Sequence, residues 1–123
     1  MIRSEADKRR AIAAGDRAVQ GGARLRGTSL RVPADISSAA FFLVGALIAE
    51  SSGLLLEHVG VNPTRIGPIH ILRALGARIE LRNERSVGGE PVADLWVESG
   101  PLRGIPIPVE QVPLAIDEFP ALF

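Results

Sequence analysis

The segment from Ser37 to Glu50 places the strongest constraint on the fold, because it is apolar on almost every side. At its start, Asp35, Ser37 and Ser38 carry the short oxygen-bearing side chains that accept hydrogen bonds from the first free amides of a helix. A helix at a protein surface is apolar along one face only. The segment therefore predicts a helix that is buried and that has neighbours on more than one side.

The rest of the chain predicts short strands and one further helix. Apolar and alternating residues predict strands at 23–32, 54–59, 77–81 and 93–98, a short strand at 104–107 and a turn at 83–91. The second helix is expected from about Gly67 to Leu75, since this start places Pro68 in the first turn, where proline is tolerated, and Gly76 just past the end. The order strand, helix, strand, helix, strand, strand predicts an α/β (α+β) layer, a mixed four-stranded sheet with two helices.

Composition excludes several classes of site. The 123 residues contain no cysteine, which excludes a disulfide framework, a thiolate zinc site and a cysteine nucleophile. His58 and His70 are the only histidines, and we expect both to be structural or exposed, with no metal and no cofactor. The longest apolar run, Ala39–Ala49, is far shorter than the roughly 20 residues that cross a bilayer. No apolar signal segment is visible at the start, so we expect a soluble cytoplasmic protein.

Charge is spread unevenly along the chain, although the formal net charge is zero. Residues 1–31 carry eight Lys and Arg against three Asp and Glu, while the remainder is acidic. A basic arm can bind nucleic acid, but no aromatic residues alternate with these arginines, which argues against single-stranded nucleic acid. We expect residues 1–22 to be a flexible arm with a short helix between Ala6 and Val19, and we expect neither a nucleic-acid nor a membrane partner.

Several segments, in unbroken order, resemble the enolpyruvyl transferase family. The segments are Val32–Leu43 (Val-Pro-Ala-Asp-Ile-Ser-Ser-Ala-Ala-Phe-Phe-Leu), Asn62–Arg65, Leu75–Ala77, Gly89–Leu95, Val112–Pro113 and Ile116–Pro120. One segment such as Asn-Pro-Thr-Arg would be weak support, whereas the ordered set over about residues 23–123 is specific. Three features depart from the family pattern: Pro68 at a helical position, Ala34 in place of a common glycine, and residues 1–22.

The resemblance implies a fold of two globular domains, each built from three βαβαββ units with helices in the domain interior, an inside-out α/β barrel. Residues 23–116 are then expected to form one βαβαββ unit, and residues 117–123 the truncated first turn of the next unit. An interior position would also account for a helix that is apolar on every side. We therefore expect the chain to be an internal fragment of such an enzyme.

The family transfers the enolpyruvyl group of phosphoenolpyruvate to a hydroxyl group. The Asp-Ile-Ser-Ser-Ala-Ala segment favours the branch that uses shikimate 3-phosphate in aromatic amino acid biosynthesis, and the branch that uses UDP-N-acetylglucosamine is the alternative. Asp117 matches the family aspartate that contacts the shikimate hydroxyls and accepts a proton, so it is the candidate catalytic and substrate-binding residue. From the residues alone, the favoured interpretation of Asp117 is a cap of the terminal helix.

No other residue matches a ligand contact of the family. Arg65 and Arg73 are expected to be surface or interhelix cations, and Ser37 and Ser38 to be helix caps. Because one carboxylate cannot hold two anionic substrates, we expect the isolated chain to be inactive and to have negligible affinity for glyphosate, the inhibitor of this branch. The alternative function is a non-catalytic module that associates with itself or with a complementing partner fragment through an exposed apolar helix face.

Overall fold

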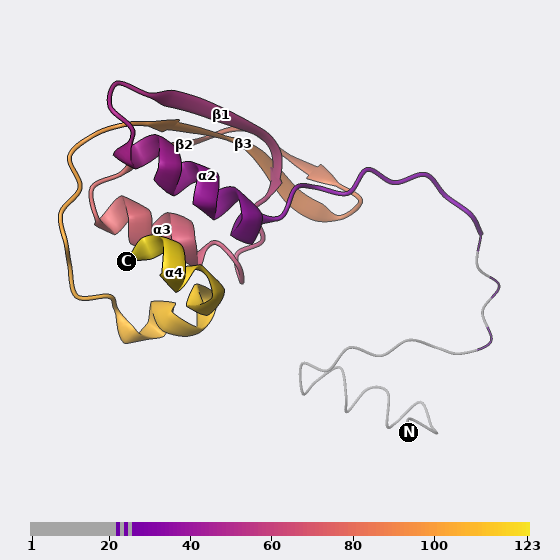
Figure 1. The fold of residues 1–123 in the computed structure, drawn as a ribbon. Helices are drawn as coiled ribbons and strands as arrows, with labels where there is room; N and C mark the ends of the chain where they lie inside the picture. The colour runs from indigo at the N-terminus through magenta and orange to yellow at the C-terminus, as the bar shows by residue number, and fades with distance from the viewer. Residues whose placement is uncertain (1–21, 23, 25) are drawn as a thin grey trace.

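The helices α2 (Ile36–Ile48) and α3 (Gly67–Ala74) lie against the same face of a small sheet in the computed structural model (Figure 1). The structure describes residues 22, 24 and 26–123, so the helix expected in the N-terminal arm lies outside the described residues. The other elements are β1 (Gly53–Gly60), β2 (Arg78–Val87), β3 (Glu90–Glu98), the 3-10 helices η1 (Val109–Leu114) and η2 (Ile116–Glu118), and α4 (Phe119–Leu122). None of the helices in this described part is long and apolar enough to cross a membrane. The expected α/β architecture is confirmed.

Local chemistry sets the starts of both long helices. Asp35 is the N-cap of α2, and its Oδ2 accepts hydrogen bonds from the Ser38 amide (2.9 Å) and the Ser38 hydroxyl (3.2 Å). The expectation that Ser37 and Ser38 are themselves caps is wrong, because the oxygen that caps this helix belongs to Asp35. α3 starts at Gly67 with Pro68 in its first turn, as the sequence predicts.

The sheet has the strand order β1-β3-β2, and both pairings are antiparallel. The expected number of four strands is wrong, because residues 26–32 form no strand in the described chain. Only Ala34 extends the sheet, through an isolated parallel bridge to Val59. Leu30 and Val32 are 67% and 75% exposed, so these apolar side chains pack against no other surface. In addition, Pro33 has no backbone N–H to donate to a neighbouring strand.

The hairpin of β2 and β3 is longer than the sequence predicts. Residues 83–87 continue β2, although the sequence predicts a turn there. Only Gly88 and Gly89 form the turn, with φ of 60° and 87°, the positive values that a tight two-residue hairpin turn needs. Residues 83–86 are all polar, so they lack the alternation of apolar and polar residues that predicts a strand. This explains the difference. The short strand expected at 104–107 is also absent, because Pro106 and Pro108 cannot donate to a ladder.

Asp94 lies in the middle of the central strand and is only 7% exposed. Its Oδ1 accepts hydrogen bonds from the His58 amide (2.8 Å) and Arg85 Nη2 (3.1 Å), and its Oδ2 accepts one from Asn83 Nδ2 (2.8 Å). His58 in β1 and Asn83 in β2 have φ of 59° and 50°, and the register shifts next to each of them. One carboxylate therefore holds an irregularity of the β-bulge type in each neighbouring strand.

We predict that the stability of the fold depends on Asp94 at low pH. Hydrogen bonds from Asn83 and from the His58 amide, together with Arg85, lower the pKa of Asp94 from 3.8 to about 2. Because the folded-state pKa lies below the unfolded-state value, this stabilisation is complete above about pH 4 and is lost as the pH falls through about 2. Urea unfolding across this range is expected to show a shallower pH dependence for Asp94→Asn. Equal slopes in the two proteins would contradict the assignment.

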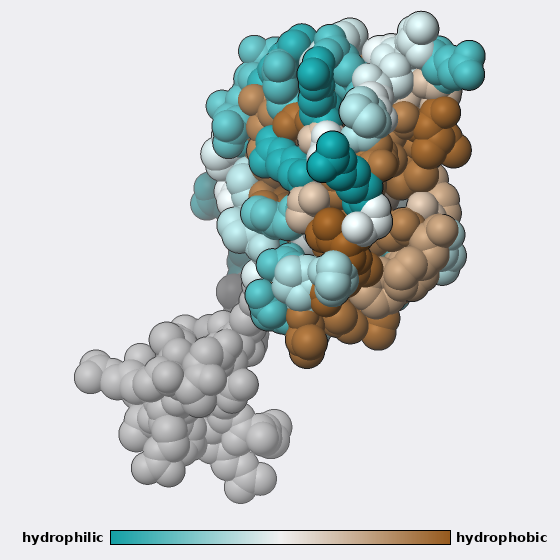
Figure 2. Space-filling model, turned by 90° about the vertical axis from the view of Figure 1, so that its left-hand side faces the viewer, coloured by the Kyte–Doolittle hydropathy of each residue, from teal (hydrophilic) through white to brown (hydrophobic). Residues whose placement is uncertain are grey.

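α2 buries one face and exposes another, although the sequence predicts burial on more than one side. Its buried residues are Ile36, Ala39, Ala40, Leu43, Ala46 and Leu47. In contrast, Phe41, Phe42 and Ile48 are 55%, 62% and 72% exposed. Figure 2 shows that hydrophobic residues gather over a broad area on one side of the molecule. The apolar pattern of the segment therefore corresponds to a helix with one uncovered apolar face.

Candidate functional site

Asp117 lies in η2 and lines a polar hollow of about 220 Å³. The residues around this hollow are Thr64, Arg65, Pro113, Leu114, Ile116, Asp117 and Glu118. Asp117 is exposed, and neither η2 nor α4 has a side-chain cap, so the interpretation of Asp117 as a helix cap is wrong. The residue is instead exposed at the edge of the hollow.

A glycine allows the two walls of this hollow to approach each other. η1 packs against α3, and a Cβ atom on Gly67 would lie 2.5 Å from the carbonyl oxygen of Leu114 and 2.7 Å from its carbonyl carbon. Side-chain carbons do not come this close to backbone atoms, so the contact needs a residue without Cβ. Arg65 lies just before this contact in the chain and Asp117 just after it. The contact therefore sets how the two side chains lie relative to each other.

Glu118 is next to Asp117 in the sequence but differs from it in burial. It is 4% exposed and lines the same hollow. Carboxylates are rarely buried without a partner, yet no hydrogen bond or ion pair within the described part of the chain involves the Glu118 side chain. The sequence alone assigns a role to Asp117 and none to Glu118. Its burial depends on the packing of η2 against α2. The residues next to Glu118 in the sequence do not indicate this packing.

The other wall of the hollow is the loop between β1 and α3, which is held by hydrogen bonds of its side chains. Asn62 Oδ1 accepts hydrogen bonds from the amide (3.1 Å) and the hydroxyl (2.9 Å) of Thr64, which orders the turn before α3. Arg65 Nη2 donates to Ser37 Oγ (3.2 Å) and lies 3.5 Å from Asp35 Oδ1 in an ion pair. Arg65 is a surface cation, as the sequence predicts, but it also ties the start of α3 to the N-cap of α2.

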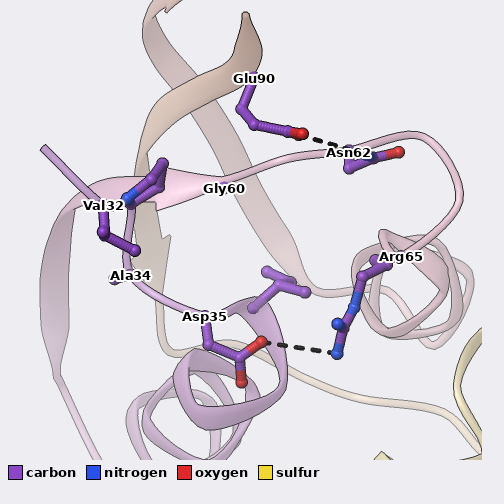
Figure 3. A pocket seen from close by; sticks show the side chains of 9 residues that line it. Val32, Ala34, Asp35, Gly60, Asn62, Arg65 and Glu90 are labelled. Carbon is purple, nitrogen blue, oxygen red and sulfur yellow. Dashed lines mark hydrogen bonds and ion pairs between the residues drawn. The ribbon is translucent and has the colours of Figure 1, made fainter. Parts of the chain in front are cut away.

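A second hollow, of about 390 Å³, adjoins the start of α2 (Figure 3). Its lining residues are Val32, Pro33, Ala34, Asp35, Ile36, Gly60, Asn62, Arg65 and Glu90. Figure 3 shows Arg65 pointing toward Asp35, and Asn62 beside Glu90, where Asn62 Nδ2 donates to Glu90 Oε2 over 3.3 Å. Arg65 lines both hollows, which therefore adjoin each other at the loop before α3.

The remaining candidates from the sequence line neither hollow. Arg73 donates to the carbonyl oxygen of Ile79 from Nε (3.1 Å) and Nη2 (2.7 Å), so it joins α3 to β2. His58 is half-buried, with Nδ1 3.1 Å from Arg85 Nη2, and His70 is exposed. The described residues bring together no group of three or more side chains suited to a metal ion.

Comparison with known proteins identifies the family. The family model of EPSP synthase (3-phosphoshikimate 1-carboxyvinyltransferase) matches residues 10–123, so the departure from the family pattern expected for residues 1–22 is wrong for residues 10–22. The 3-phosphoshikimate 1-carboxyvinyltransferase of Alkalilimnicola ehrlichii is 68% identical over 105 residues, which are 85% of this chain and 24% of the relative. The protein of the same name from Nitrosococcus oceani is 63% identical over 105 residues, with coverage of 85% and 24%.

A solved structure supports the same assignment. EPSP synthase from Acinetobacter baumannii has a TM-score of 0.77 and 49% sequence identity to this chain, with coverage of 99% of this chain and 30% of that chain. This chain spans about a quarter (24%) of the length of the curated relatives it matches. These names agree with the branch that the Asp-Ile-Ser-Ser-Ala-Ala segment favours. The chain belongs to the EPSP synthase family.

Proposed function

We propose that this chain forms the part of an EPSP synthase that carries its catalytic aspartate, Asp117. The complete enzyme transfers the enolpyruvyl group of phosphoenolpyruvate to shikimate 3-phosphate, with release of phosphate, in cytoplasmic aromatic amino acid biosynthesis. The observation that carries the proposal is the position of Asp117, which lines an open polar hollow in a chain of this family.

The proposed role of Asp117 is to contact the shikimate hydroxyl groups and to accept a proton. The hydroxyl that receives the enolpyruvyl group must lose its proton, and a carboxylate within hydrogen-bonding reach can take it. Asp117 suits this role because it is exposed and makes no hydrogen bond to another side chain among the described residues. Glu118 provides a second carboxylate on the same side of the hollow.

Both substrates are anions, so their binding needs several cations. Of the described residues, Arg65 is the one cation that lines the hollow beside Asp117. Asp117 and Glu118 repel phosphate groups from their side of it. We therefore assign the other cations to parts of the enzyme outside this chain, which spans 24% of the Alkalilimnicola relative. On this basis the chain alone is expected to show no turnover.

A second candidate function is association with a complementing fragment or with a second copy of the chain. The observation that favours it is the uncovered face of α2, where Phe41, Phe42 and Ile48 are 55%, 62% and 72% exposed. Large exposed apolar areas mark interfaces or sites of aggregation. Sedimentation of the chain tests this function. A shift to larger species with rising concentration supports association, and a monomer at every concentration excludes self-association.

A chimaera tests the enzymatic function. In the full-length Alkalilimnicola relative, the 105 aligned residues are replaced by those of this chain, and the protein is made in cells that lack their own enzyme. Phosphate release is measured with both substrates and, as a control, with each substrate alone. We expect kcat within about tenfold of the parent enzyme, which corresponds to about 1.4 kcal/mol in the barrier. A chimaera that melts like its parent but shows no turnover would contradict the proposed function.

A further inference from the structure

Arg65 has hydrogen-bonding capacity that the described residues leave unused. A guanidinium group carries five N–H donors in a planar fork. The side-chain contacts of Arg65 with the described residues involve Nη2, which donates to Ser37 Oγ over 3.2 Å and lies 3.5 Å from Asp35 Oδ1. Its Nε and Nη1 make no hydrogen bond to these residues, and the side chain is 57% exposed. One edge of the guanidinium is therefore available to a ligand.

Asp35 lies beside this guanidinium group but does not use up its hydrogen-bond donors. Asp35 Oδ2 accepts the capping hydrogen bonds from Ser38, and Oδ1 lies toward Arg65. Their separation of 3.5 Å exceeds the length of about 2.7–2.9 Å that a direct charge-assisted hydrogen bond has. Ion pairs that are this exposed contribute little to stability. The ion pair with Asp35 therefore adds little to the stability of the fold and leaves the guanidinium able to bind a further anion.

We propose that Arg65 binds an oxyanion of the substrate, a phosphate or carboxylate group, in the hollow that it shares with Asp117. This inference rests on the proposed function above. The planar fork of arginine matches both groups through two parallel hydrogen bonds. Arg65 also lines the larger hollow, so a ligand bound to it can extend beyond the space beside Asp117.

The distribution of charge around the hollow favours one of the two substrates. Asp117 and Glu118 come from η2, whereas Arg65 comes from the loop before α3. The carboxylates repel an anion and accept hydrogen bonds from hydroxyl groups, while the guanidinium attracts the anion. A fitting ligand therefore carries hydroxyl groups on one side and an oxyanion on the other. Shikimate 3-phosphate has both features, and phosphoenolpyruvate has only the oxyanions.

Kinetics of the chimaera test this role. Arg65→Gln is expected to raise the KM for shikimate 3-phosphate by about 10- to 100-fold, the range for a lost hydrogen bond to a charged group, with little change in kcat. Arg65→Lys keeps the charge but not the fork, so it is expected to recover part of the affinity. Arg82→Gln is the matched control, because Arg82 is also an exposed arginine in an ion pair, with Glu80, and lines neither hollow.

Measuring both KM values identifies the source of the oxyanion. A rise in the KM for shikimate 3-phosphate assigns the oxyanion to the acceptor, and a rise confined to phosphoenolpyruvate assigns it to the donor substrate. Either result supports an oxyanion at Arg65. An active chimaera in which Arg65→Gln changes neither KM by more than about threefold would overturn the inference and leave the proposed function intact.

Titration of the 123-residue chain with inorganic phosphate gives an independent measurement that does not need turnover. The nitrogen-15 signal of the Arg65 Nε–H group is expected to shift and saturate with phosphate at constant ionic strength, but not with chloride. A shift that stays linear in phosphate concentration would overturn the inference. Saturable binding together with an inactive chimaera would support the oxyanion site and count against the proposed function alone.

Discussion

Asp117→Asn in the chimaera is expected to lower kcat by about 10²- to 10⁴-fold, the usual contribution of a general base. Asparagine keeps the shape of the side chain and one oxygen acceptor, but it cannot take a proton at neutral pH. The KM for shikimate 3-phosphate is expected to change less than kcat, because the amide oxygen still accepts a hydrogen bond from a hydroxyl group. Initial rates of phosphate release over a range of substrate concentrations separate the two effects.

The same substitution distinguishes catalysis from a structural role of Asp117. Asparagine caps a helix as well as aspartate does, so a residue that served only as a cap would tolerate the change. Thermal melting of both proteins serves as the control, and we expect the two melting temperatures to agree. An unchanged kcat in a protein that melts normally would contradict the assignment of Asp117 as the proton acceptor.

Gly67→Ala is expected to destabilise the chain by about 1–3 kcal/mol, the cost of overpacking a tight contact. The added Cβ would lie 2.5 Å from the carbonyl oxygen of Leu114 and 2.7 Å from its carbonyl carbon, and backbone atoms cannot rotate away. The contact can relax only by a shift of η1 away from α3, which also moves Asp117 away from Arg65. Urea unfolding of the chain measures the loss of stability, and kcat/KM of the chimaera is expected to fall with it.

Gly45→Ala is the matched control for this prediction. This glycine-to-alanine change lies within α2, where none of the surrounding atoms considered lies within 4 Å of the added Cβ. Alanine in a helix interior is expected to stabilise the protein by about 0.5–1 kcal/mol relative to glycine. Opposite signs for the two variants would identify the contact with Leu114 as the cause. A stabilising effect of both would contradict the role given to Gly67.

The starts of α2 and α3 are predictable from the sequence because their signals are local. Asp35 caps α2 through an amide three residues away, and Pro68 fits the first turn of α3. Both effects act within one turn, so no distant residue is needed. The candidate carboxylate Asp117 is also found from the sequence, because a family motif surrounds it.

The strands are less predictable because pairing depends on distant residues. Residues 26–32 carry a strand-like pattern but meet no apolar surface, whereas residues 83–87 lack the pattern and still continue β2. The Asp94 carboxylate, which comes from β3, accepts the hydrogen bond of Asn83 that holds this part of β2. No feature of the sequence within 83–87 indicates that Asp94 is the partner of Asn83. The sequence therefore predicts a turn there.

The sequence by itself determined the two helices and the cap at Asp35, because each depends on residues that are close together in the chain. It also determined the family and the candidate Asp117, through motifs that recur in a fixed order along the chain. The tertiary structure decided what surrounds Asp117. The contact between Gly67 and Leu114 brings the loop before α3 next to η2, so that Arg65 and Asp117 line one hollow and Glu118 is buried beside them. Packing between segments far apart in the chain creates this arrangement, and neither segment alone carries a signal for it.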